Sequence, residues 1–438
     1  MRFLDLIIKK RDGESLTQEE INYMIQAFNK GLIPDYQMSA MLMAIFFHGL
    51  SSKETSALTA ALAGSGEILD FTSMGKIVAD KHSSGGVGDK VTIILAPLVA
   101  AAGVPLGKIS GRGLGFTGGT IDKLESIPGF SADLSIESFT ELVRKNNLAI
   151  MAQTEQITPA DGKLYALRDV TGTIDNISLI AASIMSKKIA AGAGAILLDV
   201  KTGSGAFMRS KDEAFRLSET MVRIGKEMGK LVVAVVTDMS QPLGYAVGNA
   251  LEIKEAISVL KGEGPEDVEK LCIFLGGLIL ALMGKVRSHD DGKDELERLL
   301  KSGMALEKFK QMVAAQGGDL KYLDNPDLLP QASHVKKIYS TKSGYLKEID
   351  ALRIGSIAVH LGSGRSVKGE VIDPGVGVLL NHKVGTKVAK GELLATLYGK
   401  SEESIAASEK ELDQTFIISD EAVEPLPMIH GIVPPFPS

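Results

Sequence analysis

Cysteine and tryptophan are nearly absent from this chain of 438 residues, which has one cysteine, Cys272, and no tryptophan. A lone cysteine cannot form an intramolecular disulfide, so a small disulfide-stapled scaffold is excluded. The N-terminal segment 1–5 does not resemble the charged and apolar regions of a secretory signal. We therefore expect a cytoplasmic protein.

Aromatic residues and an excess of positive charge are also lacking. Aromatic residues make up 5% of the chain, and 48 Lys and Arg residues stand against 54 Asp and Glu residues, for a formal net charge of −6. This composition gives little sign of a basic, base-stacking surface, so we expect no nucleic-acid partner. The longest uncharged stretches, 91–107 and 271–284, are shorter than the ~20 apolar residues of a membrane-spanning helix, so we expect no membrane partner.

Helical patterns fill the first seventy residues. The segments Thr17–Glu20 and Ser51–Glu54 have the spacing of capping boxes and precede apolar residues at helical intervals. From about residue 70, short apolar runs alternate with helical stretches, which is the pattern of an α/β fold with a mostly parallel sheet. The expected strands are 77–79, 104–109, 148–151, 195–200 and 231–237.

The place of two helical segments in the fold is left open by the sequence. The helical stretches 158–168 and 176–190 are either crossovers of the sheet or a return to the helical unit.

After about residue 330, the segments 335–340 and 356–361 indicate strands. Segment 385–394 resembles a biotin or lipoyl carrier but lacks the lysine hairpin of those carriers, so we expect a structural, β-rich C-terminal domain.

Glycine is abundant, with 47 residues, and clusters after expected strands. In the first cluster, 80–92, closely spaced glycines allow backbone N–H groups to approach an anion, and Lys81 with the serine hydroxyls completes a phosphate cradle. The cluster matches neither a Walker A loop nor a Rossmann motif. The alternative is a tight strand-to-helix turn, which the lysine, histidine and two serines of the loop make less attractive.

Two further glycine clusters follow later strands. The second, 108–124, also lies between a strand and a helix, so we expect it to face the first across a crevice at the carboxyl ends of the strands. The third, 199–207, is equally consistent with a β-turn and a helix cap. In the helical insert, Ser183 and Lys187 are spaced i, i+4 and share a helix face, which we interpret as part of a lid over the phosphate loops.

Three long motifs together carry a family resemblance. Lys81–Asp89, Ser110–Gly115 and Thr117–Glu125 resemble the signature of the pyrimidine nucleoside and thymidine phosphorylases. The stretch from Tyr165 through Thr173 and on to Lys187 is similar to that family as well, and the resemblance covers essentially the whole chain.

The resemblance implies a fold with three parts. They are a small all-helical domain, a large α/β domain with a mostly parallel sheet, and a β-rich α+β C-terminal domain. The expected bounds are 1–66 and 161–193 for the helical domain, 70–160 and 194–330 for the α/β phosphate-binding domain, and 331–438 for the C-terminal domain.

The activity implied by the resemblance is reversible phosphorolysis of pyrimidine nucleosides (uridine, thymidine and deoxyuridine) by a homodimer. Inorganic phosphate is then the co-substrate, and no organic cofactor is expected. The implied catalytic residues are His82, Arg168 and Lys187. The implied substrate-binding residues are His82, Tyr165, Arg168, Ser183, Lys187 and Lys108, and the implied phosphate-binding residues are Lys81, His82, Ser83, Thr92, Lys108, Ile109, Ser110 and Thr120.

The family resemblance also implies a monovalent cation, potassium, held near Gly88 by a segment that includes Leu243, Ala246 and Glu255. Position 90, often a threonine in the bacterial relatives, is Lys90 here. Its ammonium either replaces the ion or points outward while backbone oxygens bind potassium. We expect weak or absent potassium activation.

Two residue roles and three other functions stay open. His82 either protonates or stabilises the leaving pyrimidine, or only positions its ring. Lys108, as in broad-specificity relatives, either hydrogen-bonds the ribose 2′-OH or adds charge to the phosphate site; we expect use of both uridine and thymidine. The alternatives are a strict thymidine phosphorylase, an enzyme like anthranilate phosphoribosyltransferase, which would need acidic groups for magnesium, and a non-catalytic nucleoside- or phosphate-binding protein.

Overall fold

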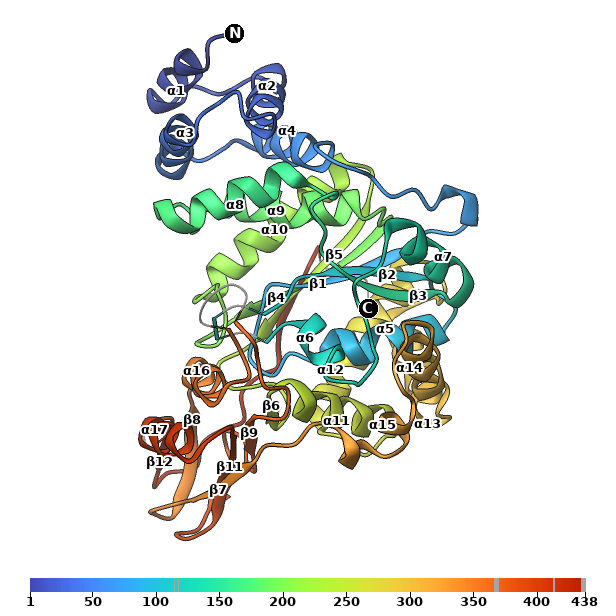
Figure 1. The fold of residues 1–438 in the computed structure, drawn as a ribbon, viewed down its shortest axis with the longest axis vertical. Helices are drawn as coiled ribbons and strands as arrows, with labels where there is room; N and C mark the ends of the chain where they lie inside the picture. Colours follow the sequence, from blue (N-terminus) through green and yellow to red (C-terminus); the bar gives the residue numbers. More distant parts are fainter. Residues whose placement is uncertain (114, 117, 366–369, 413, 435–438) are drawn as a thin grey trace.

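The computed structural model describes residues 1–113, 115–116, 118–365, 370–412 and 414–434. A helical bundle lies at one end, a sheet flanked by helices in the middle, and a β-rich unit at the other end (Figure 1). Leu114 and Thr117, which belong to the glycine-rich motifs, lie outside the described residues. In the described part of the chain, no helix has both the length and the apolar character needed to cross a membrane.

Both predicted capping boxes are confirmed in the N-terminal bundle. The Thr17 and Ser51 side chains accept hydrogen bonds from the backbone N–H groups of Glu20 and Glu54 at the starts of two helices. The helical insert packs against this bundle, since Leu164 and Leu179 join its apolar cluster. The helices of this group are α1 (Phe3–Arg11), α2 (Gln18–Asn29), α3 (Asp35–His48), α4 (Ser52–Ala63), α8 (Pro159–Thr171) and α9 (Ile177–Ala190).

The central sheet has the order β13-β5-β4-β1-β2-β3, and all neighbours except β13 and β5 are parallel. All five expected strands are present, with shifted ends. The first begins two residues later than predicted and continues to Ser83, so Lys81 and His82 lie on a strand rather than in the loop after it. The strands are β1 (Ala79–Ser83), β2 (Leu106–Ser110), β3 (Leu148–Ala152), β4 (Ala195–Thr202), β5 (Leu231–Asp238) and β13 (Ile429–Val433).

The two faces of the sheet are covered by different helices. Successive side chains of a strand point to opposite faces. In β4, Ile196 and Leu198 therefore join the apolar cluster on one face, and Leu197 joins the cluster on the other. The first face is covered by α7 (Ile136–Asn146), α9 and α10 (Lys211–Glu227), and the second by α5 (Val91–Ala101), α11 (Asn249–Leu260), α12 (Glu266–Leu282), α13 (His289–Lys301) and α14 (Met304–Ala315).

The C-terminal region corrects one strand prediction. Segment 356–361 lies in α16 (Ala351–Leu361), because Asp350 caps that helix and Ile354, Ile357 and Leu361 are buried at helical spacing. The strand predicted at 335–340 is confirmed as β7. Other elements are β6 (Ala246–Val247), β7 (His334–Tyr339), β8 (Gly344–Ile349), β9 (Gly377–Leu380), β10 (Lys387–Val388), β11 (Leu393–Gly399), β12 (Phe416–Ser419), α6 (Thr120–Leu124), α15 (Lys321–Asp324) and α17 (Glu402–Leu412).

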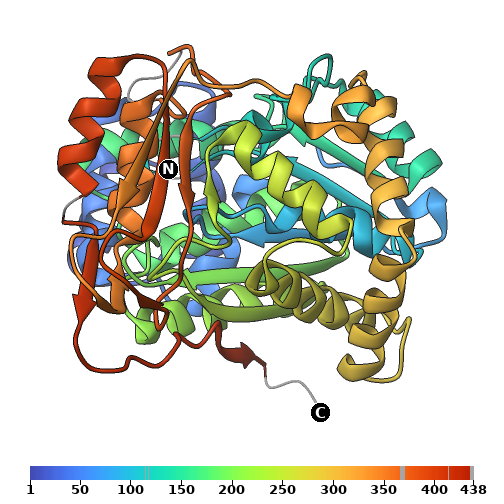
Figure 2. The same ribbon diagram turned by 90° about the horizontal axis from the view of Figure 1, so that it is seen from below.

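Two short strands tie the C-terminal region to the rest of the fold. β6, from the α/β part, pairs with β9, and β13, from the end of the chain, pairs with β5 at the edge of the central sheet. Seen from below, β13 lies apart from the other C-terminal strands (Figure 2). The loop that contains Leu243 and Tyr245 thus leads directly into a strand shared by both units.

Candidate active site

The first two glycine-rich loops line one cavity of about 290 Å³ at the carboxyl ends of β1 and β2. β1 lies between β4 and β2 in the sheet, so the loops after β1 and β2 leave the same edge side by side. Positive φ angles of 96° at Gly85 and 71° at Gly88 allow the first loop to turn tightly. The expected phosphate-binding residues that line this cavity are His82, Ser83, Thr92, Lys108, Ile109, Ser110 and Thr120.

A second cavity, of about 240 Å³, adjoins the first. Its polar lining comes from two sides. The helical insert supplies Tyr165, Arg168, Asp175 and Ser183, and β1 with the loop after it supplies His82, Ser83 and Ser84. His82 and Ser83 line both cavities, so they stand at the junction. Apolar side chains complete the second cavity, namely Ile174, Ile180, Ile184, Phe207, Met208 and Leu217.

Arg168 is held rigidly at the edge of the second cavity. Its Nε and Nη2 atoms donate to the carbonyls of Thr173 (3.1 Å) and Ile174 (2.7 Å), which follow the end of α8. Burial lowers the pKa of Arg168, although a guanidinium remains charged in any ordinary pH range. A fixed, partly desolvated cation beside an apolar cavity suits a flat ring whose carbonyl oxygens carry negative charge.

Lys187, on α9, is expected both to bind the base and to form part of a lid over the glycine-rich loops. It lines the first cavity rather than the second, pairs with the buried carboxylate of Asp161, and donates to Ser183 Oγ over 2.9 Å. Sequence reasoning missed Asp161. The available signal was its spacing on α8, because Asp161, Tyr165 and Arg168 are four and three residues apart and share one face of the helix.

Lys81 lies beneath the loops and is not among the described residues that line either cavity. Its Nζ is 3.0 Å from Asp199 Oδ2 and 3.9 Å from Asp89 Oδ2, and Lys201 Nζ approaches Asp199 to 2.8 Å. Burial by itself would lower the pKa of Lys81, but the carboxylates of Asp199 and Asp89 outweigh burial and raise it. Lys81 is thus a fixed positive charge under the two glycine-rich loops.

Lys108 and Lys188 share one carboxylate at the wall of the first cavity. Lys188 Nζ is 2.7 Å from Asp80 Oδ2, and Lys108 Nζ is 3.9 Å from Asp80 Oδ1. Burial, with added repulsion from Lys188, lowers the pKa of Lys108 to about 7. Lys188 was also missed, although it stands next to Lys187 on α9.

His82 is held in the neutral form at the junction of the cavities. Burial, followed by repulsion from Lys188, Lys108 and Lys81, lowers the pKa of His82 well below its ordinary value. Its Nε2 atom is shielded from solvent and has no hydrogen-bond partner among the described residues. A neutral imidazole with a free ring nitrogen at this place can orient a ligand that spans both cavities.

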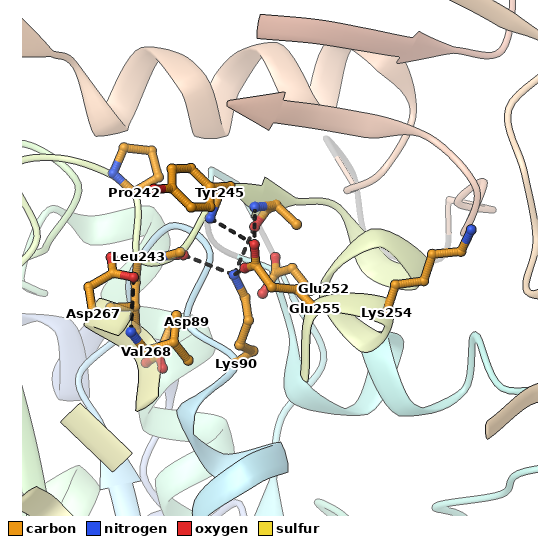
Figure 3. Close-up of polar contacts among 12 residues, drawn as sticks. Asp89, Lys90, Pro242, Leu243, Tyr245, Glu252, Lys254, Glu255, Asp267 and Val268 are labelled. Carbon is orange, nitrogen blue, oxygen red and sulfur yellow. Dashed lines mark hydrogen bonds and ion pairs between the residues drawn. The ribbon is translucent and has the colours of Figure 1, made fainter. Parts of the chain in front are cut away.

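The residues expected to hold potassium surround a lysine instead. Lys90 Nζ donates to the carbonyls of Leu243 and Ala246, each over 2.9 Å, and pairs with Glu255 (Figure 3). Burial would lower the pKa of Lys90, but Glu255 and Glu252 outweigh burial and raise it, so the ammonium remains charged. Of the two orientations left open by the sequence, Lys90 adopts the inward one, so its ammonium occupies the place among these oxygen atoms that a free potassium ion would need.

Comparisons with known proteins cover all three parts of the fold. Family models match at 4–66 (glycosyl transferase family, helical bundle domain), 75–306 (glycosyl transferase family, a/b domain) and 345–419 (pyrimidine nucleoside phosphorylase C-terminal domain). A solved structure of anthranilate phosphoribosyltransferase from Thermus thermophilus is similar with a TM-score of 0.60 and 19% identity, over 71% of this chain and 98% of that one. This likeness shows the shared fold alone.

Curated relatives are similar over nearly the full length. The chain is 54% identical over 403 residues to the pyrimidine-nucleoside phosphorylase of Geobacillus stearothermophilus, covering 92% of this chain and 93% of the relative. It is 53% identical over 402 residues to that of Bacillus subtilis (strain 168), with the same coverage, and 50% identical over 433 residues to a Staphylococcus epidermidis relative, covering 99% and 100%. The chain therefore belongs to the pyrimidine-nucleoside phosphorylases, within the glycosyl transferase family whose helical and α/β domains it contains.

Proposed function

We propose that this protein catalyses the reversible phosphorolysis of pyrimidine nucleosides to the free base and α-D-ribose or deoxyribose 1-phosphate. One observation carries the proposal: two cavities of opposite character meet at His82 and Ser83. The first is lined by lysines, serine hydroxyls and glycine backbone, as an anion requires, and the second is largely apolar with one guanidinium, as a pyrimidine ring requires. The sugar bond that breaks would lie at their junction.

The first cavity would hold the attacking phosphate. Ser83, Thr92, Ser110 and Thr120 would donate hydrogen bonds to it, with Ile109 contributing its backbone and Lys108 its charge. Lys81 would act from beneath through its fixed positive charge. Holding phosphate in line with the anomeric carbon can supply ~7–11 kcal/mol of the barrier, because phosphate is otherwise a weak nucleophile.

The second cavity would hold the departing base. Negative charge develops on the pyrimidine carbonyls as the glycosidic bond breaks, so donors placed there stabilise the transition state more than the ground state. Arg168 would supply a fixed charge, with Tyr165 and Ser183 completing the ring site. His82, neutral in the free enzyme, would position the ring, and Lys187 would reach the base when α8 and α9 move closer to the phosphate loops.

Such a movement is the proposed role of the helical domain. Residues 1–66 and 161–193 would close as a unit over 70–160 and 194–330 and would exclude water from the reacting sugar. Residues 331–438 would form the structural C-terminal domain. Dimerisation of two copies is supported by large exposed apolar side chains on α1 and α3, namely Leu4, Ile8, Tyr36, Met43 and Phe47.

We propose broad use of uridine and thymidine rather than of thymidine alone. Lys108 reaches the cavity from β2 next to Ser110 and would donate to a ribose 2′-OH as well as to phosphate. The relatives carry the name pyrimidine-nucleoside phosphorylase, which does not favour strict thymidine specificity. A cytoplasmic location remains a prediction that cell fractionation tests.

The deciding experiment follows base release by ultraviolet absorbance from thymidine, uridine and cytidine, each with and without phosphate. We expect release from thymidine and uridine only when phosphate is present. Release from thymidine alone would indicate the strict enzyme, and release without phosphate would indicate a hydrolase. Binding of thymine and phosphate without turnover would leave only a binding protein.

A further inference from the structure

The acceptor atoms around Lys90 are already matched one to one by its ammonium. The carbonyl oxygens of Leu243 and Ala246 and the Glu255 carboxylate receive the N–H groups, so each donor of the ammonium has an acceptor. Lys90 is fully buried, and such a burial is tolerated only with an opposite charge and complete hydrogen bonding. We call the space enclosed by the carbonyls of Leu243 and Ala246 and the carboxylate of Glu255 the cage. The cage is therefore occupied by the ammonium of Lys90.

The second carboxylate oxygen of the cage is already used by backbone donors of the described residues. The second oxygen of Glu255, Oε1, accepts from the backbone N–H groups of Tyr245 (2.9 Å) and Ala246 (3.1 Å). The space is closed as well: a Cβ at Gly88 would lie 2.6 Å from the Leu243 carbonyl oxygen, and one at Gly244 would lie 2.8 Å from Lys90 Nζ. A second cation here would also be repelled by the ammonium.

Lys90 joins the phosphate loop to the loop that leads into β6. Its neighbour Asp89 lines the phosphate cavity and accepts a hydrogen bond from Ser83. On the far side, Asp267 accepts from Gly244 N over 3.0 Å and pairs at 2.8 Å with Lys383 of the C-terminal region. The ammonium of Lys90 thus connects residues 243–246 to the phosphate loop, in addition to the backbone hydrogen bond that Leu243 N donates to Val87 O over 3.1 Å.

We propose that the Lys90 ammonium is a built-in monovalent cation, which anchors the phosphate loop to residues 243–246 and makes the protein independent of added potassium. Shortening this side chain leaves two carbonyls and a carboxylate around a buried space of ammonium size, and a free monovalent cation then becomes necessary to fill it. The variant becomes a cation-dependent protein.

The first arm of the test measures the melting temperature of the wild-type protein while tetramethylammonium chloride is replaced by potassium chloride at constant ionic strength. We expect no saturable shift, because the cage is occupied by Lys90. A saturable rise in the wild-type melting temperature with potassium would overturn the proposal. This arm needs no variant to fold and no activity, so its result is separate from the function proposed above.

The second arm compares Lys90→Thr with Lys90→Met. Lys90→Thr should melt lower than wild type without a small cation and recover saturably with potassium or ammonium chloride, by about 5 °C when the ion greatly exceeds its dissociation constant. Lys90→Met is one atom shorter than lysine but places an apolar methyl group next to the acceptors, where it obstructs a hydrated or free ion, so it should melt lower and should not recover. A Lys90→Thr protein that responds no more than Lys90→Met would contradict the proposal.

Lys254→Thr is the matched control, because it also replaces a lysine by threonine. Lys254 lies on α11 next to Glu255, but its side chain points away from the cage (Figure 3). It should show no response to potassium. Phosphorolysis assays of the same variants form a third readout, which rests on the proposed function: Lys90→Thr should gain activity with potassium in parallel with its stability. Stability that recovers in a protein inactive in every form would support the built-in cation and count against the proposed function.

Discussion

The Lys188 ammonium lies 2.7 Å from Asp80 Oδ2, while the other oxygen of the same carboxylate lies 3.9 Å from Lys108 Nζ. One buried carboxylate therefore faces two buried lysines at the wall of the phosphate cavity. One negative charge cannot balance two ammonium groups, so burial and then Lys188 lower the pKa of Lys108 to about 7. In the proposed reaction, a bound phosphate dianion would supply the missing negative charge.

The first prediction concerns the pH dependence of phosphate use. Lys108 is charged below a pKa of about 7 and neutral above it. We expect kcat/KM for phosphate to fall as the pH rises through this range, because the neutral amine attracts the anion less. Inorganic phosphate loses a proton in the same range, so Lys108→Arg is the control that keeps the charge at all pH values. Superimposable profiles for the two proteins would show that Lys108 does not titrate there.

The second prediction is that Lys188→Met shifts the fall of kcat/KM for phosphate, called the pH limb below, to higher pH. Without Lys188, the Asp80 carboxylate interacts with Lys108 alone, and the pKa of Lys108 rises. We expect an upward displacement of the limb in kcat/KM for phosphate by about one pH unit, which corresponds to about 1.4 kcal/mol of altered interaction. Lys188→Arg retains the charge and should retain the wild-type limb. A limb that stays in place in Lys188→Met would mean that the two lysines are not coupled.

The third prediction concerns His82, whose lowered pKa makes it neutral in the free enzyme. We expect His82→Asn to lower kcat/KM for the nucleoside by roughly ten- to a hundredfold through lost positioning. Between about pH 6 and 8, the profile of kcat/KM against pH should have the same shape in His82→Asn as in wild type. A neutral imidazole does not gain a proton in this range. An acid limb present in wild type and absent from His82→Asn would instead assign a proton-donating role.

Local signals explain which parts of the fold were predictable. The capping boxes at Thr17 and Ser51 and the five central strands follow from spacing within a few residues, and the structure contains them all. The prediction of a strand at 356–361 was wrong, because a short run of apolar residues suits a strand and a helix equally. The deciding feature is the Asp350 cap several residues earlier.

The candidate site was predictable to a similar extent. Glycine clusters and the family resemblance pointed to residues that line the two cavities, such as Ser110 and Arg168. The charged partners beneath them were missed, because Asp199 and Asp161 contact Lys81 and Lys187 only after distant segments come together. Spacing along a sequence carries little information about such long-range ion pairs.

The fourth prediction concerns the stability of the helical bundle. Glu54 is buried, pairs with Lys10 at 3.0 Å and accepts from the backbone of Leu16 and Ser51. Burial alone would raise the pKa of Glu54, but these hydrogen bonds outweigh burial and lower it. This contribution is present above the ordinary pKa of a glutamate and is lost as the pH falls through the lowered one.

We therefore expect Glu54→Gln to reduce the free energy of unfolding near neutral pH by about 3–5 kcal/mol, because it leaves the Lys10 charge buried without its partner. Urea unfolding measures this loss, which should shrink in acid. Glu20 is the matched control: it occupies the same position of a capping box and pairs with Lys9, but in a more exposed place. Glu20→Gln should cost about 1 kcal/mol or less. Equal losses in the two variants would show that burial of the Lys10 pair is not the cause.

The last prediction uses the ion pair between Asp161 and Lys187, which joins α8 to α9. Asp161 is buried and touches Lys187 rather than the space of either cavity, so it would act by positioning Lys187. We expect Asp161→Asn to lower kcat/KM for the nucleoside by roughly ten- to a hundredfold, in line with about 1.5–3 kcal/mol for a hydrogen bond to a charged group. The KM for phosphate should stay close to the wild-type value.

A double-mutant cycle separates positioning from a general loss of structure. If Asp161 acts only through Lys187, then Lys187→Met and the double variant Asp161→Asn/Lys187→Met should have similar kcat/KM values, because the second change removes nothing further. Additive losses would mean that Asp161 acts independently of Lys187. A rise confined to the KM for phosphate would instead assign Lys187 to the cavity that it lines in this structure, and the base site would then depend on Arg168 for its positive charge.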